Sequence, residues 1–240
     1  MIVFSNVFKS FGPKRVLQDF SLEIPDGQTT VLLGYSGTGK SVALKHIVGL
    51  LEPDSGTVEV DGLNVPELDR DTLTKLRARI GYVFQFAALF DSLSVHENVA
   101  LGLRQQGLDR AEIEARVADS LARVNLADAG ARYPAELSGG MRKRVGIARA
   151  IALSPRYILY DEPTTGLDPV TSAVIDELMV RCKQELGVTG VVVTHDMRST
   201  FAVADRIAML YEGRVHAVGT ADEIRRTDDP IVRQFIEGRP

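Results

Sequence analysis

Hydrophobic residues follow two different spacings along the first part of the chain. Short apolar runs bounded by Gly, Pro, Asn or Asp predict β-strands. These runs lie at residues 2–4, 17–24, 29–33 and 57–60, the last after a turn over 53–56. After Ser41 the apolar positions recur at helical spacing as far as Leu51, and Gly49 with Pro53 marks the end of that pattern. We therefore expect a strand-rich region with one helix that begins directly on a glycine-rich loop.

From about residue 87 to residue 137 the strand signals disappear. Ile113, Val117, Leu121 and Val124 are spaced four, four and three residues apart, which places them on one face of a helix. The charged residues around them lie mostly on the other faces. This segment predicts a helical insertion inside an α/β frame.

The α/β pattern surrounds that insertion. Continuous apolar runs, typical of parallel strands that are covered on both faces, lie at 80–84, 157–160 and 191–194. A helix is predicted at 172–185, between the last two. The C-terminal part predicts a hairpin over 207–211 and 214–218, then a short helix over 221–226. We find no internal repeat and no low-complexity segment.

Composition limits the classes of protein that fit. The 240 residues are 45% hydrophobic, which is enough for a packed core. The net charge of -4 provides no basic surface for nucleic acid, so we expect no nucleic-acid partner. The one cysteine, Cys182, excludes an internal disulfide, and its helical apolar neighbours predict a packed side chain. Residues 1–5 lack a targeting pattern and no run reaches the roughly 18 apolar residues of a membrane span, so we expect a cytosolic chain.

The glycine-rich loop between the strand at 29–33 and the helix after it matches a phosphate-binding P-loop. Its residues are Gly34, Tyr35, Ser36, Gly37, Thr38, Gly39, Lys40 and Ser41. The glycines let successive backbone N–H groups turn toward a β-phosphate. Lys40 supplies a cation for the β- and γ-phosphates, and the Ser41 hydroxyl can ligate Mg²⁺.

Polar residues end three of the apolar strands. Asp161 and Glu162 follow the run at 157–160, so Asp161 is expected near the Mg²⁺ shell while Glu162 can reach the water that attacks the γ-phosphate. Gln85 follows the run at 80–84 and could complete the metal shell or orient the water. His195 follows the run at 191–194, where a nitrogen donor could contact the γ-phosphate.

A third motif, at 137–141, contains Ser138, Gly139 and Gly140. A Ser-Gly-Gly turn that opens a helix offers free backbone N–H groups and a helix dipole to an anion. Because the chain already has one phosphate-binding loop, a second one predicts a nucleotide shared between two copies of the protein.

Taken in order, these motifs resemble those of ABC transporter ATPases. They match Walker A at 34–41, the Q-loop at Gln85, the signature at 137–141, Walker B at 157–162, the D-loop at 166–168 and the switch histidine at His195. The similarity runs from about residue 2 to residue 225. It implies a single cassette over 1–240: a RecA-like core with an N-terminal antiparallel β-subdomain at 1–86 and 156–225, an α-helical subdomain at 87–155, and a tail at 226–240.

The resemblance also implies ligands and partners. Two copies would pack head to tail with ATP and Mg²⁺ in the seam, an isologous arrangement. Each ATP would meet Walker A and Walker B of one copy, and Ser138, Gly139 and Gly140 of the other. Phe11 falls where the family stacks an aromatic ring on adenine, with Val16 nearby, and Asp168 belongs to the nucleotide-binding set. Glu162 would be the general base, with His195 and Lys40 as the other catalytic residues; Ser41, Gln85 and Asp161 would hold the metal.

One departure narrows the resemblance. Met141 stands where the commoner signature has Gln, and it cannot supply that polar contact. The runs at 137–145 and 84–93 look like the ATPase of MCE-type lipid transporters, the maintenance-of-lipid-asymmetry class. That class implies a permease in the inner (plasma) membrane with this chain on its cytoplasmic face, an MCE-type lipid-binding protein and a small regulatory subunit. Arg142, Lys143 and Arg144 cannot share one helix face, and their pattern favours a solvated charge run.

Apolar residues within 86–103 fall where the family forms a groove for a cytoplasmic helix of the permease. They are Phe86, Leu89, Phe90, Leu93 and Val95. Ordinary core packing explains several of them equally well.

Alternatives remain at the level of function. An amino-acid or ion importer fits the same motifs, because the cassette does not touch cargo. A soluble ABC ATPase acting on DNA or ribosomes usually carries a long coiled-coil insertion or two cassettes, and the signature turn argues against a small-molecule kinase. The sequence leaves open the substrate, the transport direction and the role of the tail, whose Ile231, Val232, Phe235 and Ile236 could pack on their own chain or on a neighbour.

Overall fold

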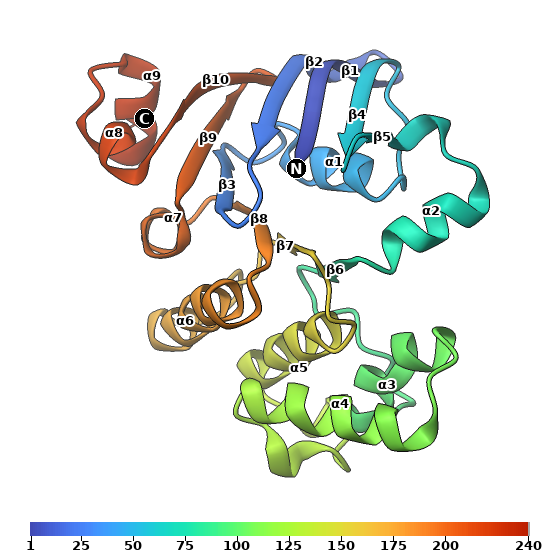
Figure 1. The fold of residues 1–240 in the computed structure, drawn as a ribbon. Helices are drawn as coiled ribbons and strands as arrows, with labels where there is room; N and C mark the ends of the chain where they lie inside the picture. The colour runs from blue at the N-terminus through green and yellow to red at the C-terminus, as the bar shows by residue number, and fades with distance from the viewer. Residues whose placement is uncertain (240) are drawn as a thin grey trace.

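The computed structural model, which describes residues 1–239, contains two β-sheets and their covering helices (Figure 1). The first sheet has the order β2-β1-β4-β5, and its neighbouring strands are antiparallel. Its strands are β1 (Ile2–Phe11), β2 (Lys14–Ile24), β4 (Ser55–Val60) and β5 (Leu63–Asn64). The expected antiparallel β-subdomain is confirmed.

The second sheet has the order β10-β9-β3-β8-β7-β6. Its strands are β3 (Thr29–Gly34), β6 (Ile80–Val83), β7 (Tyr157–Asp161), β8 (Thr189–Thr194), β9 (Arg206–Tyr211) and β10 (Arg214–Gly219). All neighbours are parallel except β9 and β10, which form the expected hairpin. Parallel strands end at one common edge, so the residues that follow β3, β7 and β8 are brought together.

The parallel strands are buried on both faces, which explains their continuous apolar runs. Val31 and Leu33 of β3 pack into the core beneath the helices, whereas Leu32 packs into the core shared with the antiparallel sheet. Strand β8 alternates in the same way, with Val192 in the first core and Val191 in the second. The expected α/β frame is therefore confirmed by two cores, one on each face of the sheet.

The helices of the described residues complete these cores. They are α1 (Lys40–Ile47), α2 (Arg70–Arg77), α3 (Val95–Gln105), α4 (Arg110–Arg123), α5 (Gly139–Ile151), α6 (Pro169–Leu186), α7 (Met197–Val203), α8 (Ala221–Arg226) and α9 (Pro230–Ile236). Short 3₁₀ helices cover Val65–Glu67, Ala127–Ala129 and Pro134–Glu136. Helices α3, α4 and α5 contact one another and form the lower part of the molecule in Figure 1.

The helical insertion is confirmed at α4. Ile113, Val117 and Leu121 form its buried face, as their spacing predicts, and Asp109 caps its N-terminus by accepting the N–H of Glu112. Helix α3 begins with a capping box in which the Ser94 hydroxyl and the Glu97 carboxylate each bind the other's backbone N–H. Such a box satisfies N–H groups that have no partner inside the helix.

Several boundaries differ from the sequence expectation. Strand β1 continues beyond residue 4 to Phe11, because irregular pairing with β2 absorbs the left-handed residues Asn6 and Asp19. Helix α1 ends before Leu50, whose side chain is exposed rather than on the expected helix face. Helix α2 was not predicted, because only two of its eight residues are apolar and two positions do not define a helical spacing. Of these two, Leu76 is buried.

The C-terminal segment packs on its own chain. Val232 of α9 is buried in the core beneath the helices, and Ile231, Phe235 and Ile236 pack against that core. Cys182 is buried in α6, as expected, and burial raises the pKa of its thiol to about 11.

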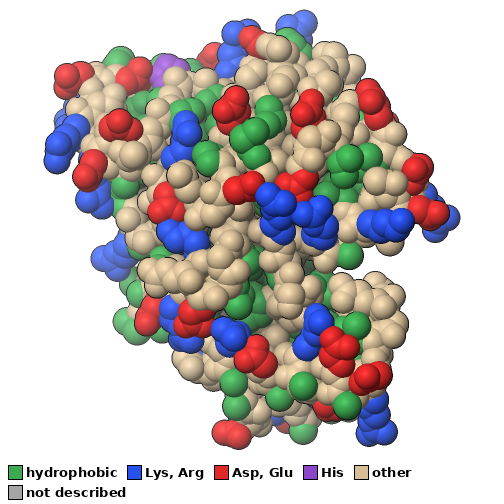
Figure 2. Space-filling view, in the orientation of Figure 1, with side chains coloured by type: hydrophobic (Ala, Val, Ile, Leu, Met, Phe, Trp, Pro, Cys, Tyr) green, Lys and Arg blue, Asp and Glu red, His purple; other side chains and the backbone are tan. Residues whose placement is uncertain are grey.

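Figure 2 shows acidic and basic side chains interspersed over one face of the molecule, in agreement with the small net charge. Among the helices of residues 1–239, none combines the length and the apolar content needed to cross a bilayer.

Candidate active site

The residues that follow the parallel strands surround a pocket of about 700 Å³ at their common edge. Most of the predicted site residues line it. They are Phe11, Tyr35, Ser36, Gly37, Gly39, Lys40, Ser41, Gln85, Glu162 and His195. The sequence prediction therefore located this pocket, although its parts come from segments far apart along the chain.

The glycine-rich loop passes close to neighbouring backbone. At Gly34, with φ of 154°, an added Cβ would lie 2.5 Å from the carbonyl oxygen of Leu210, so a side chain has no room there. Thr38 closes the loop by donating its hydroxyl hydrogen to the Tyr35 carbonyl over 2.9 Å. The residue before α1 is Gly39, and no side chain caps this helix, so the N–H groups of its first turn are available to an anion.

Lys40 is buried at the floor of the pocket. Its Nζ donates hydrogen bonds to the carbonyls of Gly34 and Tyr35 at 2.7 and 2.9 Å. An ammonium group has three donors, so one remains for a ligand. Burial lowers the pKa of Lys40, and the charges of Glu162 and Asp161 oppose that shift.

Ser41 and Asp161 meet although they belong to different strand ends. The Ser41 hydroxyl donates to Asp161 Oδ1 over 2.6 Å, and the Tyr82 hydroxyl donates to Asp161 Oδ2 over 3.2 Å. Hydroxyl and carboxylate oxygens are ligands that Mg²⁺ prefers, and in nucleotide sites Mg²⁺ takes one or two protein ligands beside phosphates and waters. Within residues 1–239 no cluster of three or more His, Cys, Asp or Glu side chains is placed to hold a metal. These residues fit a phosphate-bound Mg²⁺.

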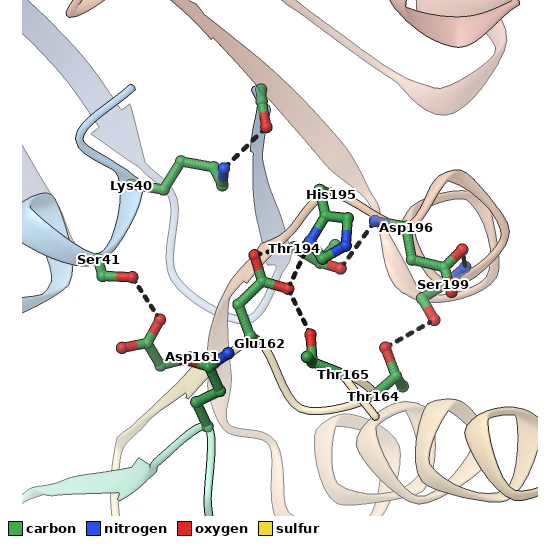
Figure 3. A network of polar contacts seen from close by, with 12 residues as sticks. Lys40, Ser41, Asp161, Glu162, Thr164, Thr165, Thr194, His195, Asp196 and Ser199 are labelled. Atoms are coloured by element: carbon green, nitrogen blue, oxygen red, sulfur yellow. Dashed lines mark hydrogen bonds and ion pairs between the residues drawn. The ribbon is translucent and has the colours of Figure 1, made fainter. Parts of the chain in front are cut away.

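The Glu162 carboxylate faces the pocket beside His195 (Figure 3). Glu162 Oε2 lies 2.9 Å from His195 Nδ1 and accepts a hydrogen bond of the same length from the Thr165 hydroxyl. The residue has a φ of 50°, a conformation that few residues other than glycine adopt. Its backbone N–H donates to the Val193 carbonyl over 2.9 Å, which anchors this bend to β8.

His195 is held at the start of a helix that the sequence did not predict. Asp196 caps α7 by accepting the N–H groups of Arg198 and Ser199, and its own N–H donates to the Thr194 hydroxyl over 3.0 Å. The imidazole is largely exposed, so it can meet a ligand in the pocket.

Aromatic side chains form another part of the wall. Phe11 is 46% exposed at the end of β1. The pocket is also lined by Phe235 of α9, whose ring meets the Tyr35 ring edge-on with centroids 4.8 Å apart. Lys14, Val42 and Phe235 also line the pocket and were not predicted. The apolar residues of the tail indicated that it packs against another surface, but not which surface.

The signature residues lie outside this pocket. Ser138 caps α5 by accepting the N–H of Met141 over 3.2 Å. Gly140 approaches α6 so closely that an added Cβ would lie 2.4 Å from Thr171 Cγ2. Gly139 lines a separate cavity of about 400 Å³. In one copy of the chain these residues therefore do not meet the residues of Walker A.

Asp168 is also away from the pocket. Its carboxylate caps α6 by accepting the N–H groups of Val170 and Thr171, each over 3.0 Å. Within one copy of the chain, neither Asp168 nor Ser138 lines the pocket.

The basic run at 142–144 is not uniformly solvated. Arg142 is exposed, as expected, and donates to the Leu137 carbonyl over 2.8 Å. Arg144 is half-buried and donates to the Val124 carbonyl over 3.1 Å. The expectation is wrong for Lys143, which is 6% exposed because its position on α5 faces the strand ends.

The apolar residues predicted for a groove, in and after the loop that follows β6, fall into a buried group and an exposed group. Val95 is buried in the core and Leu89 packs against it, whereas Phe86 and Phe90 are 83% and 53% exposed. Phe90 lines a surface cavity of about 350 Å³ together with Phe84. Core packing thus holds for Val95 and Leu89, whereas Phe86 and Phe90 lie at the surface, and the groove for a permease helix stays a prediction.

Comparison with known proteins gives a consistent result. The family model described as ABC transporter matches residues 17–165. A probable ribonucleotide transport ATP-binding protein of Mycobacterium tuberculosis is 41% identical over 232 residues, which are 96% of this chain and 65% of that protein. The chain thus spans about 65% of the length of this relative.

Two other relatives differ in their stated cargo. A methionine import ATP-binding protein of Carboxydothermus hydrogenoformans is 41% identical over 240 residues, covering 98% of this chain and 71% of its own length. The intermembrane phospholipid transport system ATP-binding protein of Escherichia coli is 39% identical over 228 residues, covering 95% and 85%.

Solved structures share the fold. The dimeric ATP-binding cassette MJ0796 bound to ADP and Pi has a TM-score of 0.84 and 36% identity, covering 92% of this chain and 99% of its own. The cbiO1 protein of Clostridium perfringens, part of an ABC transporter complex, has a TM-score of 0.87 and 31% identity, covering 97% and 93%.

Proposed function

The chain belongs to the ABC transporter family, and from this membership we propose that it hydrolyses ATP as one of two identical motor subunits of a membrane transporter. One observation carries the proposal: Lys40, Ser41, Glu162 and His195 come from three parts of the chain to one pocket at the common edge of the parallel strands. Such edges bind nucleotides in open α/β folds.

The pocket suits a nucleoside triphosphate with Mg²⁺. Phe11 offers an exposed ring for the base, beside Val16. The N–H groups of Gly37 and Gly39 and the Lys40 ammonium meet the phosphates. Ser41 and Asp161 would hold the Mg²⁺, and Gln85, which lines the pocket from the loop after β6, would complete its shell. When bound, Mg²⁺ neutralises charge on the phosphate oxygens.

Hydrolysis uses the carboxylate beside the histidine. Glu162 accepts a proton from the attacking water, as a general base must, and the Thr165 hydroxyl helps to orient its carboxylate. His195 lies within hydrogen-bond distance of Glu162 and contacts the γ-phosphate.

A second copy completes the site. Ser138, Gly139 and Gly140 open α5 and, with Asp168, lie outside the pocket of their own chain, so they are free to meet the ATP of a partner. The N-terminus of α5 carries a partial positive charge that favours phosphate. The dimer reported for the cassette MJ0796 supports this arrangement.

The exposed aromatic residues after β6 form the contact with the permease. Asn98 of α3 is fully buried and exchanges hydrogen bonds with the backbone N–H and carbonyl of Phe90 over 2.8 and 3.1 Å. Arg149 donates to the carbonyls of Ala87 and Ala88 over 2.6 and 2.7 Å. A loop held this firmly can present Phe90 to a partner helix, although it contains no regular structure.

The transported substrate we propose is phospholipid or a related lipid. The similarity to the phospholipid transport protein of Escherichia coli and the sequence around Met141 support an MCE-type permease complex. The chain then lies on the cytoplasmic face of the inner (plasma) membrane, with an MCE-type lipid-binding protein and a small regulatory subunit as further partners. The similar identity to a methionine importer keeps an amino-acid or ion importer as the second candidate.

Purification of the native complex from membranes, followed by mass spectrometry of its proteins and lipids, tests this proposal. We expect a permease, a lipid-binding protein with a single membrane anchor, and enriched phospholipid. A soluble amino-acid-binding or ion-binding protein in place of the lipid-binding one would assign the chain to an importer. Absence of the chain from the membrane fraction would favour a soluble ABC ATPase, and phosphate transfer to an acceptor other than water would indicate a kinase.

A further inference from the structure

Lys143 of α5 reaches the back of the active site. Its side chain is 6% exposed, and its Nζ donates a hydrogen bond to the backbone carbonyl of Gln85. The same Nζ donates to the backbone carbonyl of Glu162 over 3.1 Å. One ammonium group therefore joins α5 to two loops whose side chains line the nucleotide pocket.

These two carbonyls belong to the loop after β6 and to the bend after β7, so Lys143 reaches both strand ends from α5. Arg142 and Arg144, on either side along α5, bond instead to carbonyls of the insertion, at Leu137 and Val124. The bonds of Lys143 thus cross from the insertion to the strand ends, while those of its neighbours stay within it.

The position of the Glu162 backbone decides where its carboxylate points. Its N–H is anchored to Val193 of β8, and its φ of 50° bends the chain at this residue. The carbonyl on the other side of the bend accepts from Lys143. The Thr165 N–H also donates to this carbonyl, over the longer distance of 3.3 Å. Loss of the lysine therefore removes the bond from α5 and leaves the carbonyl with the longer bond from Thr165, which loosens the peptide that carries the carboxylate.

A buried cation requires compensation, and this one has it. Taking an ammonium group out of water is costly unless hydrogen bonds and nearby opposite charge offset the cost. Two carbonyls accept hydrogen bonds from Lys143. Burial lowers the pKa of this lysine, and the negative charges of Glu162 and Asp161 oppose that shift and so favour its charged form. A lysine that only packed its stem at the surface would place its charge in solvent.

We propose that Lys143 is a positioning residue that ties the seating of α5 to the orientation of the Glu162 carboxylate. While α5 is seated, both carbonyls are held by one ammonium group, and Glu162 faces the pocket. The same helix begins at Ser138, which in the proposed dimer meets the ATP bound by the partner copy. Binding of ATP in the partner's site is thereby linked mechanically to the position of Glu162, the general base, in this copy. This inference rests on the proposed ATPase function.

Steady-state ATPase assays of the full chain test it with three variants. Lys143→Met keeps the apolar stem but removes every donor, and we expect kcat to fall on the order of 100-fold, since a 1 Å misplacement of a catalytic group can cost that much. KM for ATP should stay within about twofold, because the P-loop is untouched. Lys143→Gln retains two donors on a shorter arm and should lose about tenfold in kcat. Arg144→Met is the control, because it removes comparable carbonyl bonds away from the pocket, and its kcat should match that of the wild type.

Hydrogen exchange adds a readout that separates positioning from general loss of stability. In Lys143→Met we expect faster exchange at residues 84–87 and 161–165, with α1 unchanged. Wild-type kcat in a folded Lys143→Met overturns the inference. If that variant does not fold, Lys143→Gln carries the test, and wild-type kcat in it overturns the inference equally. A wild-type chain that binds ATP without hydrolysing it contradicts the proposed function itself, which is a different result.

Discussion

The ring of Phe235 meets the ring of Tyr35 edge-on, with centroids 4.8 Å apart and an angle of 84° between the planes. Tyr35 belongs to the P-loop and Phe235 to α9, the last helix of the chain, so the C-terminal segment contacts the phosphate-binding loop directly. Asp229 fixes the start of α9 by accepting the N–H groups of Ile231 and Val232, each over 3.0 Å. The tail is therefore part of the nucleotide pocket.

Removal of the Phe235 ring should weaken nucleotide binding. An edge-on aromatic pair contributes about 1 kcal/mol, so we expect Phe235→Ala to raise Kd for ATP about fivefold. Calorimetric titration of ATP into the chain measures this. Ile236→Ala is the matched control, because Ile236 packs next to Phe235 on α9 but does not line the pocket. An equal loss of affinity in both variants would mean that α9 acts through stability alone.

Much of the site could be predicted because each of its motifs is a short, continuous stretch of sequence at the end of a strand. The P-loop lies between β3 and α1, and Asp161 and Glu162 end β7, so the carboxyl edge of a parallel sheet brings them together. The hydrogen bond between Ser41 and Asp161 follows from that geometry. The same applies to His195 after β8.

Other features depend on which surfaces meet in three dimensions. Lys143 reads as one more charge in a basic run, and its burial follows from the way α5 faces the strand ends. Phe235 lies far from the other motifs along the chain, and no periodicity indicates that its helix returns to the P-loop. The extension of β1 depends on left-handed Asn6, a conformation that the hydrophobic pattern does not reveal.

Replacement of Glu162 by Gln should stop turnover and preserve binding. The amide cannot accept the proton of water, and loss of a general base typically costs 10²- to 10⁴-fold in rate, so we expect kcat to fall by about that factor while ATP still binds. The ATP-bound dimer should persist long enough to appear in size-exclusion chromatography. Glu212→Gln is the control, because Glu212 also has a positive φ, of 47°, but is exposed outside the pocket. Normal turnover in Glu162→Gln would show that Glu162 is not the general base.

A charge in the exposed aromatic surface should release the permease. Phe90 is 53% exposed and lines the cavity after β6, so Phe90→Asp places a carboxylate where the partner helix would bury apolar area. We expect co-purification with the permease to fall at least about tenfold, while dimerisation with ATP is unchanged. Leu50→Asp serves as control, since Leu50 is 56% exposed and does not line this cavity. Retention of the permease by Phe90→Asp would argue against this contact surface.

Asp176 makes stability depend on pH. Its side chain is 4% exposed in α6, one oxygen accepts from the Ser199 hydroxyl over 3.0 Å, and the other has no hydrogen-bond partner among the described residues. Burial, with a smaller contribution from the charge of Asp196, raises the pKa of this carboxyl from 3.8 to about 6.

The sign of the effect follows from proton binding. Between pH 4 and 6 the folded chain holds the Asp176 proton more tightly than the unfolded chain does, so this group's contribution to the free energy of unfolding decreases as pH rises. Below pH 3.8 the contribution is complete, and above about pH 6 it is lost. A shift of about two pKa units corresponds to roughly 3 kcal/mol.

Asp176→Asn should therefore stabilise the protein at neutral pH, because the amide keeps the acceptor for Ser199 and removes the buried charge. We expect the free energy of unfolding at pH 7.5 to rise by roughly 2–3 kcal/mol, and the difference from the wild type to vanish near pH 4. Urea denaturation at both pH values measures this, with Glu177→Gln as the control, because Glu177 is the exposed neighbour on α6. A difference that is the same at both pH values would show that Asp176 is already ionised at pH 4 or stays neutral at pH 7.5, and that burial does not set its titration.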